Sequence, residues 1–597
     1  MGGIGINSDL YLAREALQVA TLQTATAGSN LANSSTAGAT NESVEITSGN
    51  NVLVGGDGID AGVDSVTVTS SRSTYLDQLV QTESSNLGSA TSLDTFLSEA
   101  QNALQESLST SGTTDQSATD SGLEAATTAF YNAWTTLGND PTSTTDQDAL
   151  STAAQSFIDT ATSVYNGLTE TKENTFTEAA TQTTQVNALV SQIGTLNQEI
   201  ERAEATGISA DGTVNQANQM RDQREADIES LSKLVNITAT QDPTNSSIIN
   251  VSLADSSSST YSTTGSGTVS AGSITINGTA VTVTAGESLS DIATSINNGV
   301  SGVTAADIDG QLSLSSDSTV SVTDGTNLGL TTPTADSPTY LVYGTTADGE
   351  TNSDGTETYS LSVAGSDADT GDTGYAADQK LTLLATNSTS GSSIVTPTGG
   401  TLGGIVTFDN DVMGVESTTP NTTTLLGQFN TFIQSVISSV NTATNAGTGT
   451  NGTAGENFFG TSSTPSTGIT DLALNELYNV SSTTFDGGSI PSGSTAANDD
   501  GSTAASIGSA ISNAAILPAY SSMVTDLGAQ TAAAATNLAS QTLVSTQATN
   551  AQQSYEGIST DDQMTELLTF QKSFEASSEF INVLDQMYQT VVTGLVS

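Results

Sequence analysis

Histidine and cysteine are absent from this chain of 597 residues. Without cysteine there is no disulfide and no thiolate metal site. Without histidine the chain lacks the commonest general base and the commonest metal ligand. Serines are abundant, but no histidine is present to activate one of them as a nucleophile. The sequence therefore predicts a protein that is not an enzyme and that binds neither a cofactor nor a metal ion.

Basic residues are also scarce. Nine lysines and arginines stand against 64 carboxylates, which gives a formal net charge of −55. This excess disfavours binding to phosphate backbones and to anionic lipids, so we expect no nucleic-acid partner and no membrane partner. Four of the basic side chains are close in sequence, and we expect them to pair with nearby carboxylates or, alternatively, to contact another subunit; they are Arg202, Arg221, Arg224 and Lys233.

Long apolar runs are missing as well. No stretch approaches the roughly 18 apolar residues that a membrane-spanning helix needs. The first thirteen residues hold no Lys or Arg and no apolar segment follows Arg14, so the sequence predicts no cleaved signal peptide. Only 35% of the residues are hydrophobic, which favours thin cores in elongated domains.

Apolar residues are instead concentrated in stripes at the two ends of the chain. Their alternating spacing of three and four places them on one side of a helix, as in a coiled-coil seam. Thr24 and Ser577 are the polar interruptions. The stripes predict that the two terminal helices meet each other or the termini of other copies, although core-facing helices of an ordinary bundle show the same spacing. We predict that the assembly interface consists of Ile6, Leu10, Ala13, Leu17, Leu31, Leu567, Phe570, Phe574, Ile581, Leu584, Tyr588, Val591 and Leu595.

Between the ends the pattern changes twice. Helical periodicity dominates as far as residue 235, short alternating apolar runs typical of strands follow over 236–400, and helical periodicity then returns. The predicted fold class is multidomain α+β, with terminal helices paired as a coiled-coil-like bundle, a second domain of long helices and an all-β inserted outer domain. The predicted domains are a terminal helical domain of 1–40 and 558–597, a mainly helical axial domain of 41–235 and 401–557, and the β-rich insertion of 236–400.

Several short motifs are familiar, and they occur in both arms of the chain. One group comprises Asn30-Leu31-Ala32-Asn33 with Thr36 and Gly38, Gly56-Asp57-Gly58-Ile59, and Asn139-Asp140-Pro141. A second group comprises Met220-Arg221-Asp222-Gln223-Arg224, Leu402-Gly403-Gly404-Ile405-Val406-Thr407-Phe408, Gly455-Glu456-Asn457-Phe458-Phe459-Gly460, and the C-terminal run from Phe570 to Ser577. In these motifs the chain resembles the FlgK family of flagellar hook-associated proteins. The usual tyrosine after Gly38 is Ala39 here.

The resemblance implies a structural subunit of the bacterial flagellum, the junction adaptor between hook and filament. Its partners would be other copies in a ring, the hook protein on one side, a second hook-associated junction protein on the other, and an export chaperone. The resemblance also implies a secreted, extracellular protein of the flagellum that is exported without a cleaved signal peptide. The terminal helices would line the inner tube of the assembly.

A further motif keeps alternatives open. Residues 272–297 contain Gly272-Ser273-Ile274-Thr275-Ile276-Asn277-Gly278 and Leu289-Ser290-Asp291-Ile292-Ala293, which resemble the hook IN motif of flagellins and filament-cap proteins. A flagellin-like or cap-like axial protein is therefore one alternative. A secreted β-rich adhesin or surface-layer protein is another, although it would not explain the matched termini.

Overall fold

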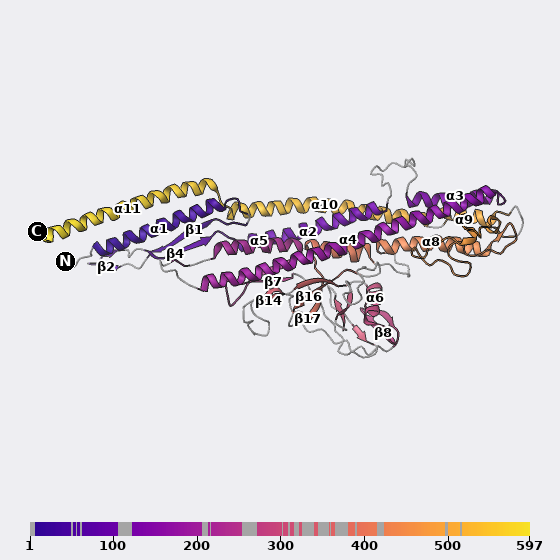
Figure 1. Ribbon diagram of the computed structural model, residues 1–597, viewed down its shortest axis with the longest axis horizontal. Helices are drawn as coiled ribbons and strands as arrows, with labels where there is room; N and C mark the ends of the chain where they lie inside the picture. Colours follow the sequence, from indigo (N-terminus) through magenta and orange to yellow (C-terminus); the bar gives the residue numbers. More distant parts are fainter. Residues whose placement is uncertain are drawn as a thin grey trace.

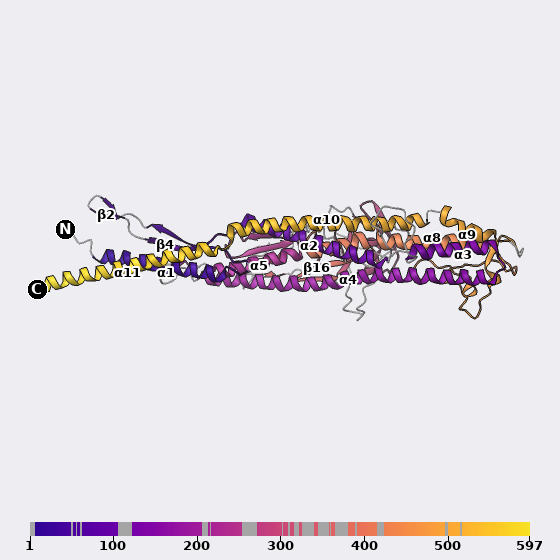
Figure 2. The same ribbon diagram turned by 90° about the horizontal axis from the view of Figure 1, so that it is seen from above.

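A computed structural model describes most of the chain: residues 6–36, 38–48, 52–54, 57–59, 63–104, 122–205, 213–214, 217–253, 271–300, 303–308, 311–315, 322–324, 340–343, 357–358, 360–364, 380–387, 391–414, 423–495, 500–513 and 516–596. The molecule is a long rod built mainly from helices, and a β-rich part lies along one side of it (Figures 1 and 2).

The body of the rod consists of helices from both arms of the sequence that run side by side. Helix α2 packs along α10, α4 packs against α3 and α5, and α8 packs against α10. The predicted return of helical periodicity after residue 400 is therefore confirmed. The body helices are α2 (Thr74–Ala103), α3 (Leu123–Asn139), α4 (Thr144–Ala205), α5 (Asn218–Leu234), α7 (Gly400–Thr407), α8 (Leu425–Ala446), α9 (Ser502–Asn513) and α10 (Ile516–Glu556).

A short glycine-rich helix fits tightly into this body. Helix α7 contains the Leu402–Thr407 part of the motif and packs against α2. A Cβ added at Gly404 would collide with the Ser92 hydroxyl and the Ser89 carbonyl, so only glycine allows the two backbones to approach this closely. The helix continues into the π-helix η1 (Phe408–Met413).

Aromatic side chains fill the core at the end of the rod where α3 and α9 lie. Phe130, Trp134, Phe157, Phe458 and Phe459 are fully buried, and their ring centroids lie 5.0–6.4 Å apart. The chain there has little regular structure, namely η2 (Glu476–Tyr478), η3 (Gly487–Ser489) and the pair β18 (Thr448–Gly449) and β19 (Pro491–Gly493).

The inserted region contains strands and also one helix, so it is β-rich but not all-β as predicted. Helix α6 (Leu289–Gly299) begins at Ser288, whose hydroxyl accepts a hydrogen bond from the Asp291 N–H, and its apolar side buries Ile292 and Ile296. The short length of this helix hid it among the strands. Together with β8 (Gly272–Ile276) and β9 (Thr279–Val283) it is formed by the hook-IN-like motif, and these elements share a core separate from that of the rod.

The remaining strands of the insertion form small antiparallel sheets. Two sheets have the orders β14-β13-β7-β6 and β15-β16-β17. A third has the order β12-β8-β9, and the fourth is the pair β10-β11. Their bounds are β6 (Ile237–Gln241), β7 (Ile249–Leu253), β10 (Thr304–Ile308), β11 (Gln311–Ser315), β12 (Val322–Asp324), β13 (Tyr340–Tyr343), β14 (Glu357–Thr358), β15 (Ser360–Ala364), β16 (Thr382–Asn387) and β17 (Gly391–Val395).

The two ends of the chain lie together at the other end of the rod. Helix α1 (Ile6–Asn33) and helix α11 (Thr560–Val596) run side by side and extend beyond the body (Figures 1 and 2). Beside α1, strands β1 (Glu42–Ser48) and β4 (Val63–Ser70) pair antiparallel, and β5 (Thr213–Val214) pairs parallel to β4. A hairpin of β2 (Val52–Val54) and β3 (Asp57–Ile59) connects the longer strands. The expectation that the termini meet each other is thus met within one chain, while coiled-coil geometry stays a prediction.

Candidate functional site: the terminal helices and the neck

The predicted stripes lie mostly between α1 and α11. On α1, Ala13 is buried, while Leu17 and Leu31 are half-buried. On α11, Leu584 is buried at 4% exposure, and Leu567, Phe570 and Ile581 are half-buried. These residues therefore serve mainly to hold the two helices together.

Two predicted residues do not join that contact. Phe574 and Tyr588 are 41% and 52% exposed. The side chains of Ile6, Leu10, Val591 and Leu595 lie outside the described residues.

A second apolar stripe on α11, which the sequence analysis missed, has no cover in the described part of the chain. Ala576, Phe580, Val583 and Met587 follow one another at intervals of four, three and four residues, so they share one side of the helix. All four are exposed, and Phe580, Val583 and Met587 keep 44–51% of their surface in contact with solvent. The sequence shows the same 3–4 spacing for these four residues, on another side of the helix from the predicted stripe. We call these four residues the second stripe.

A buried group of amides ties the base of the two terminal helices to β1. Asn30, which is 2% exposed, donates through Nδ2 to the Gln563 Oε1 at 2.9 Å and to the Glu42 carbonyl at 2.8 Å. Its Oδ1 accepts the Glu42 N–H at 3.2 Å, and Asn41 completes the group. The first asparagine of the Asn30-Leu31-Ala32-Asn33 motif is therefore the residue that joins α1, β1 and α11.

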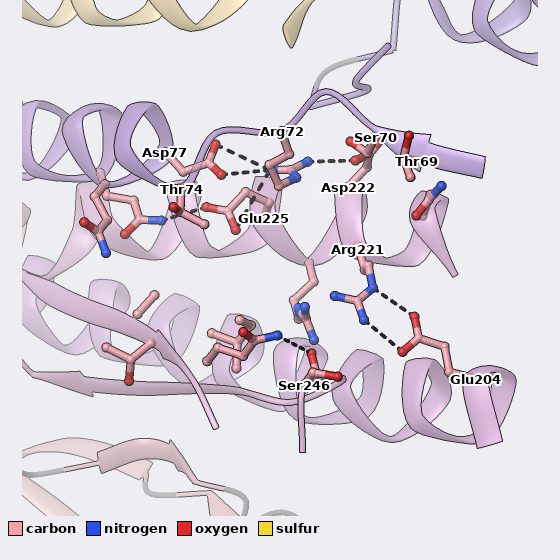
Figure 3. Close-up of a pocket in the computed structure, with 18 residues that line it drawn as sticks. Thr69, Ser70, Arg72, Thr74, Asp77, Glu204, Arg221, Asp222, Glu225 and Ser246 are labelled. Atoms are coloured by element: carbon pink, nitrogen blue, oxygen red, sulfur yellow. Dashed lines mark hydrogen bonds and ion pairs between the residues drawn. The ribbon is translucent and has the colours of Figure 1, made fainter. Parts of the chain in front are cut away.

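Just beyond these amides the terminal helices meet the body at a charged cluster, which we call the neck cluster: Arg72, Asp77, Asp222, Glu225 and Glu556. The Arg72 guanidinium lies 2.7 Å from the Asp222 carboxylate, 3.4 Å from that of Asp77 and 4.0 Å from that of Glu225 (Figure 3). Glu556, the last residue of α10, accepts the Ser73 N–H through Oε1 at 2.7 Å. Arg72, Asp77, Asp222 and Glu225 line a cavity of about 790 Å³, together with further residues of β4, α2, α4, α5, β6 and β7.

Burial and mutual repulsion raise the proton affinity of this cluster. Burial, followed by the nearby charge of Asp77, raises the pKa of Glu225 to about 7. Burial also raises the pKa of Glu556 to about 7, against the opposing hydrogen bond from the Ser73 N–H, and Asp77 adds to the rise. The pKa of Asp77 is raised by burial as well, although Arg72 partly offsets it. One guanidinium thus faces more carboxylates than it can neutralise.

The other arginines of this region pair differently from the prediction. Arg221 forms a two-pronged ion pair with Glu204 of α4, at 2.8–2.9 Å, rather than with a carboxylate nearby in sequence. Arg224 is buried and donates to the Asn197 Oδ1 and the Ser247 carbonyl, and burial lowers its pKa to about 10. Arg202 donates to the Gln198 side chain. For Arg221 and Arg224 the packing between elements sets the partner, whereas Arg202 pairs with a residue four positions earlier on its own helix.

Within the described residues no group of three or more carboxylates is arranged to hold a metal ion. In the same part of the chain, none of the helices combines the length and the apolar character that crossing a membrane requires.

Comparisons with known proteins agree with the predicted resemblance. Residues 113–323 match the family model of the flagellar hook-associated protein FlgK helical domain, and residues 551–594 match that of the flagellar basal body rod FlgEFG protein C-terminal region. No curated protein matches the chain. Among solved structures, the flagellar hook junction protein FlgK from Burkholderia pseudomallei is similar at 15% identity and a TM-score of 0.38, over 64% of this chain and 46% of that one. This chain therefore spans about half the length of that protein. The two family matches confirm the resemblance to FlgK-type flagellar hook-associated proteins over 113–323 and 551–594.

Proposed function

We propose that this protein is a structural subunit of the bacterial flagellum that acts as the junction adaptor between hook and filament and assembles through its terminal helices. The FlgK helical domain match over 113–323 favours this role over a flagellin-like or cap-like one. The rod-protein match over 551–594 falls on α11, the helix that carries the exposed apolar surface.

The second stripe is the observation that carries the proposal. A helix paired with one neighbour needs one apolar side, and α11 has two. Its first stripe faces α1, whereas Ala576, Phe580, Val583 and Met587 face solvent. Covering these side chains against another copy of the chain would remove their apolar surface from water, which is favourable. The inter-subunit contact would therefore lie on the second stripe, and the first stripe would hold each subunit's own helix pair.

The remaining features of the role follow from the family type. We propose a ring of copies with hook protein on one side and a second hook-associated protein on the other, an export chaperone, an extracellular location, and export without a cleaved signal peptide. The protein would have no catalytic role. We also propose the division into a terminal part of 1–40 and 558–597, an axial part of 41–235 and 401–557, and an insertion of 236–400.

Deletion of the gene in the source bacterium tests this function. The null strain should be non-motile and should release filament protein into the medium, because the filament would have no adaptor on which to attach. Reintroducing the intact gene should restore motility and retain the filament. A null strain that swims and retains its filaments would contradict the proposal.

A further inference from the structure

The connection between the body and α11 passes through a single short link. Helix α10 ends at Glu556, and α11 begins at Thr560. The Glu556 carbonyl accepts the Asn41 N–H at 2.8 Å and the Ser71 hydroxyl at 3.3 Å, while its carboxylate accepts the Ser73 N–H. Glu556 therefore holds the chain segments that precede β1 and follow β4. Figure 1 shows that the rod changes from body to terminal helices where α10 passes into α11.

Carboxylates from three helices surround this point. Asp77 of α2 accepts from the Gln552 side chain of α10 at 2.8 Å, and Asp222 of α5 accepts from the Thr40 N–H at 2.9 Å. Glu225 of α5 accepts from the Gln81 side chain of α2 at 2.7 Å. In addition to burial, the charge of Asp222 raises the pKa of both Asp77 and Glu556, and the charge of Asp77 raises the pKa of Glu225.

The positive charge available to these carboxylates is limited. Arg72 is the one cation in ion-pair contact with them among the described residues. Arg224 influences Glu225 from a distance, and Arg221 is already paired with Glu204 of α4. Glu229 of α5 lies close enough to Asp77 that the two carboxylates repel each other. When all these groups are ionised, the neck holds an excess of buried negative charge.

We propose that the neck cluster is a proton-controlled joint, in which proton uptake by Glu556 and Glu225 tightens the connection between the body and α11 and proton loss loosens it. The physical basis is repulsion: a neutral Glu556 still accepts the Ser73 N–H but no longer repels Asp77 and Asp222. This joint goes beyond the assembly role, because it concerns how one subunit holds its own terminal helix.

The direction of the pH dependence follows from the folded-state pKa values. A carboxyl whose pKa rises from 4.5 to about 7 on folding holds its proton more tightly in the folded neck than in the open one. The stability that it contributes is fully present below the ordinary value of 4.5 and is lost as pH rises through about 7. The neck should therefore be tight in mild acid and looser above neutrality.

The absence of cysteine allows a direct measurement on the full chain. Cysteines introduced by Ser540→Cys on α10 and Gln571→Cys on α11, both exposed positions, would carry the only spin labels. At a helical rise of 1.5 Å per residue the labels would be roughly 40 Å apart, a distance that pulsed electron paramagnetic resonance measures. In dilute monomer the distance distribution should be narrow near about pH 5.5 and should broaden as pH rises, with a midpoint near 7.

Substitutions then decide whether the cluster causes the effect. Glu556→Gln keeps an oxygen for the Ser73 N–H and removes the titrating group, so the distribution should stay narrow at both pH values. Glu225→Gln removes the other titrating carboxylate that repels Asp77, so it should reduce the broadening of the distance distribution at high pH. Glu579→Gln, an exposed change on α11, should behave as the unsubstituted chain does. The proposal is overturned if the unsubstituted distribution does not change with pH, if both cluster variants keep its full transition, or if Glu556→Gln is broad throughout.

Discussion

Two positions four residues apart on α11 should respond in opposite ways to the same kind of truncation. Leu584 is 4% exposed in the contact with α1, and Phe580 is 46% exposed in the second stripe. Leu584→Ala removes a buried side chain and leaves a gap, which costs about 2–3 kcal/mol at the lower end of core substitutions. Phe580→Ala removes a side chain that is already half in water, so the monomer should change by about 0.5 kcal/mol or less.

The assay for the monomer is hydrogen–deuterium exchange of the α1 and α11 amides at a concentration where subunits do not associate. A local loss of about 2–3 kcal/mol should accelerate exchange roughly 30- to 140-fold in both helices of the Leu584→Ala variant. The Phe580→Ala variant should exchange as the unsubstituted chain does. The body helices should be unaffected in both.

Association should show the reverse order. Burying the solvent-exposed half of a phenylalanine contributes about 1–1.5 kcal/mol per contact, so Phe580→Ala should weaken self-association roughly 5- to 12-fold at each interface. Sedimentation velocity over a concentration series measures this. If Phe580→Ala accelerated exchange in α1, the second stripe would be covered within the subunit. If it associated normally, the second stripe would not be the contact, and the reasoning would be refuted.

Three further substitutions test the contacts that hold the rod together. Asn30→Ala should destabilise the terminal helices by about 1–3 kcal/mol, because the Gln563 Oε1 and the Glu42 carbonyl lose the donor that Asn30 supplies. Faster amide exchange in α1 and α11 is the readout, and unchanged exchange would contradict the role given to Asn30. Phe458→Ala should cost about 3–5 kcal/mol and alter the fluorescence of Trp134, the single tryptophan, since their ring centroids are 5.0 Å apart; an unaltered emission spectrum would count against the aromatic cluster. Lys172→Ala should cost about 3–5 kcal/mol in urea unfolding, because it removes the partner that lies 3.1 Å from the fully buried Asp409 carboxylate; a loss below about 1 kcal/mol would mean that this ion pair is not needed.

The long helices could be predicted from the sequence because periodicity over many turns is a strong signal. Helix α4 (Thr144–Ala205) lies within the helical periodicity predicted as far as residue 235, and α10 and α11 lie within the helical periodicity predicted after residue 400. Helix α6 was missed because its apolar face covers only three turns, which single-sequence periodicity cannot separate from alternating strands.

The partners of polar side chains could not be predicted in this way. Asn30 bonds to Gln563 and Arg72 bonds to Asp222, and each pair brings together residues that are remote in sequence. Spacing rules describe neighbours on one helix, whereas these partners are set by which helices pack together. The Met220–Arg224 motif is the clearest case of partners set by packing, because Arg221 bonds to Glu204 of α4 and Arg224 bonds to the Ser247 carbonyl before β7. Neither arginine pairs with a carboxylate on its own helix, α5, which the structure describes throughout.

The same distinction applies to the terminal stripes, whose role in assembly stays a prediction. A 3–4 spacing identifies an apolar side of a helix but not the surface that covers it. In α11 one such side faces α1, and the other, the second stripe, is exposed to solvent. Because the chain passes from the body into α11 through Gly557 and the residues beside it, the direction in which the second stripe points depends on the neck. The charged cluster around Glu556 therefore controls more than local stability: it sets how firmly the proposed assembly surface is held in place.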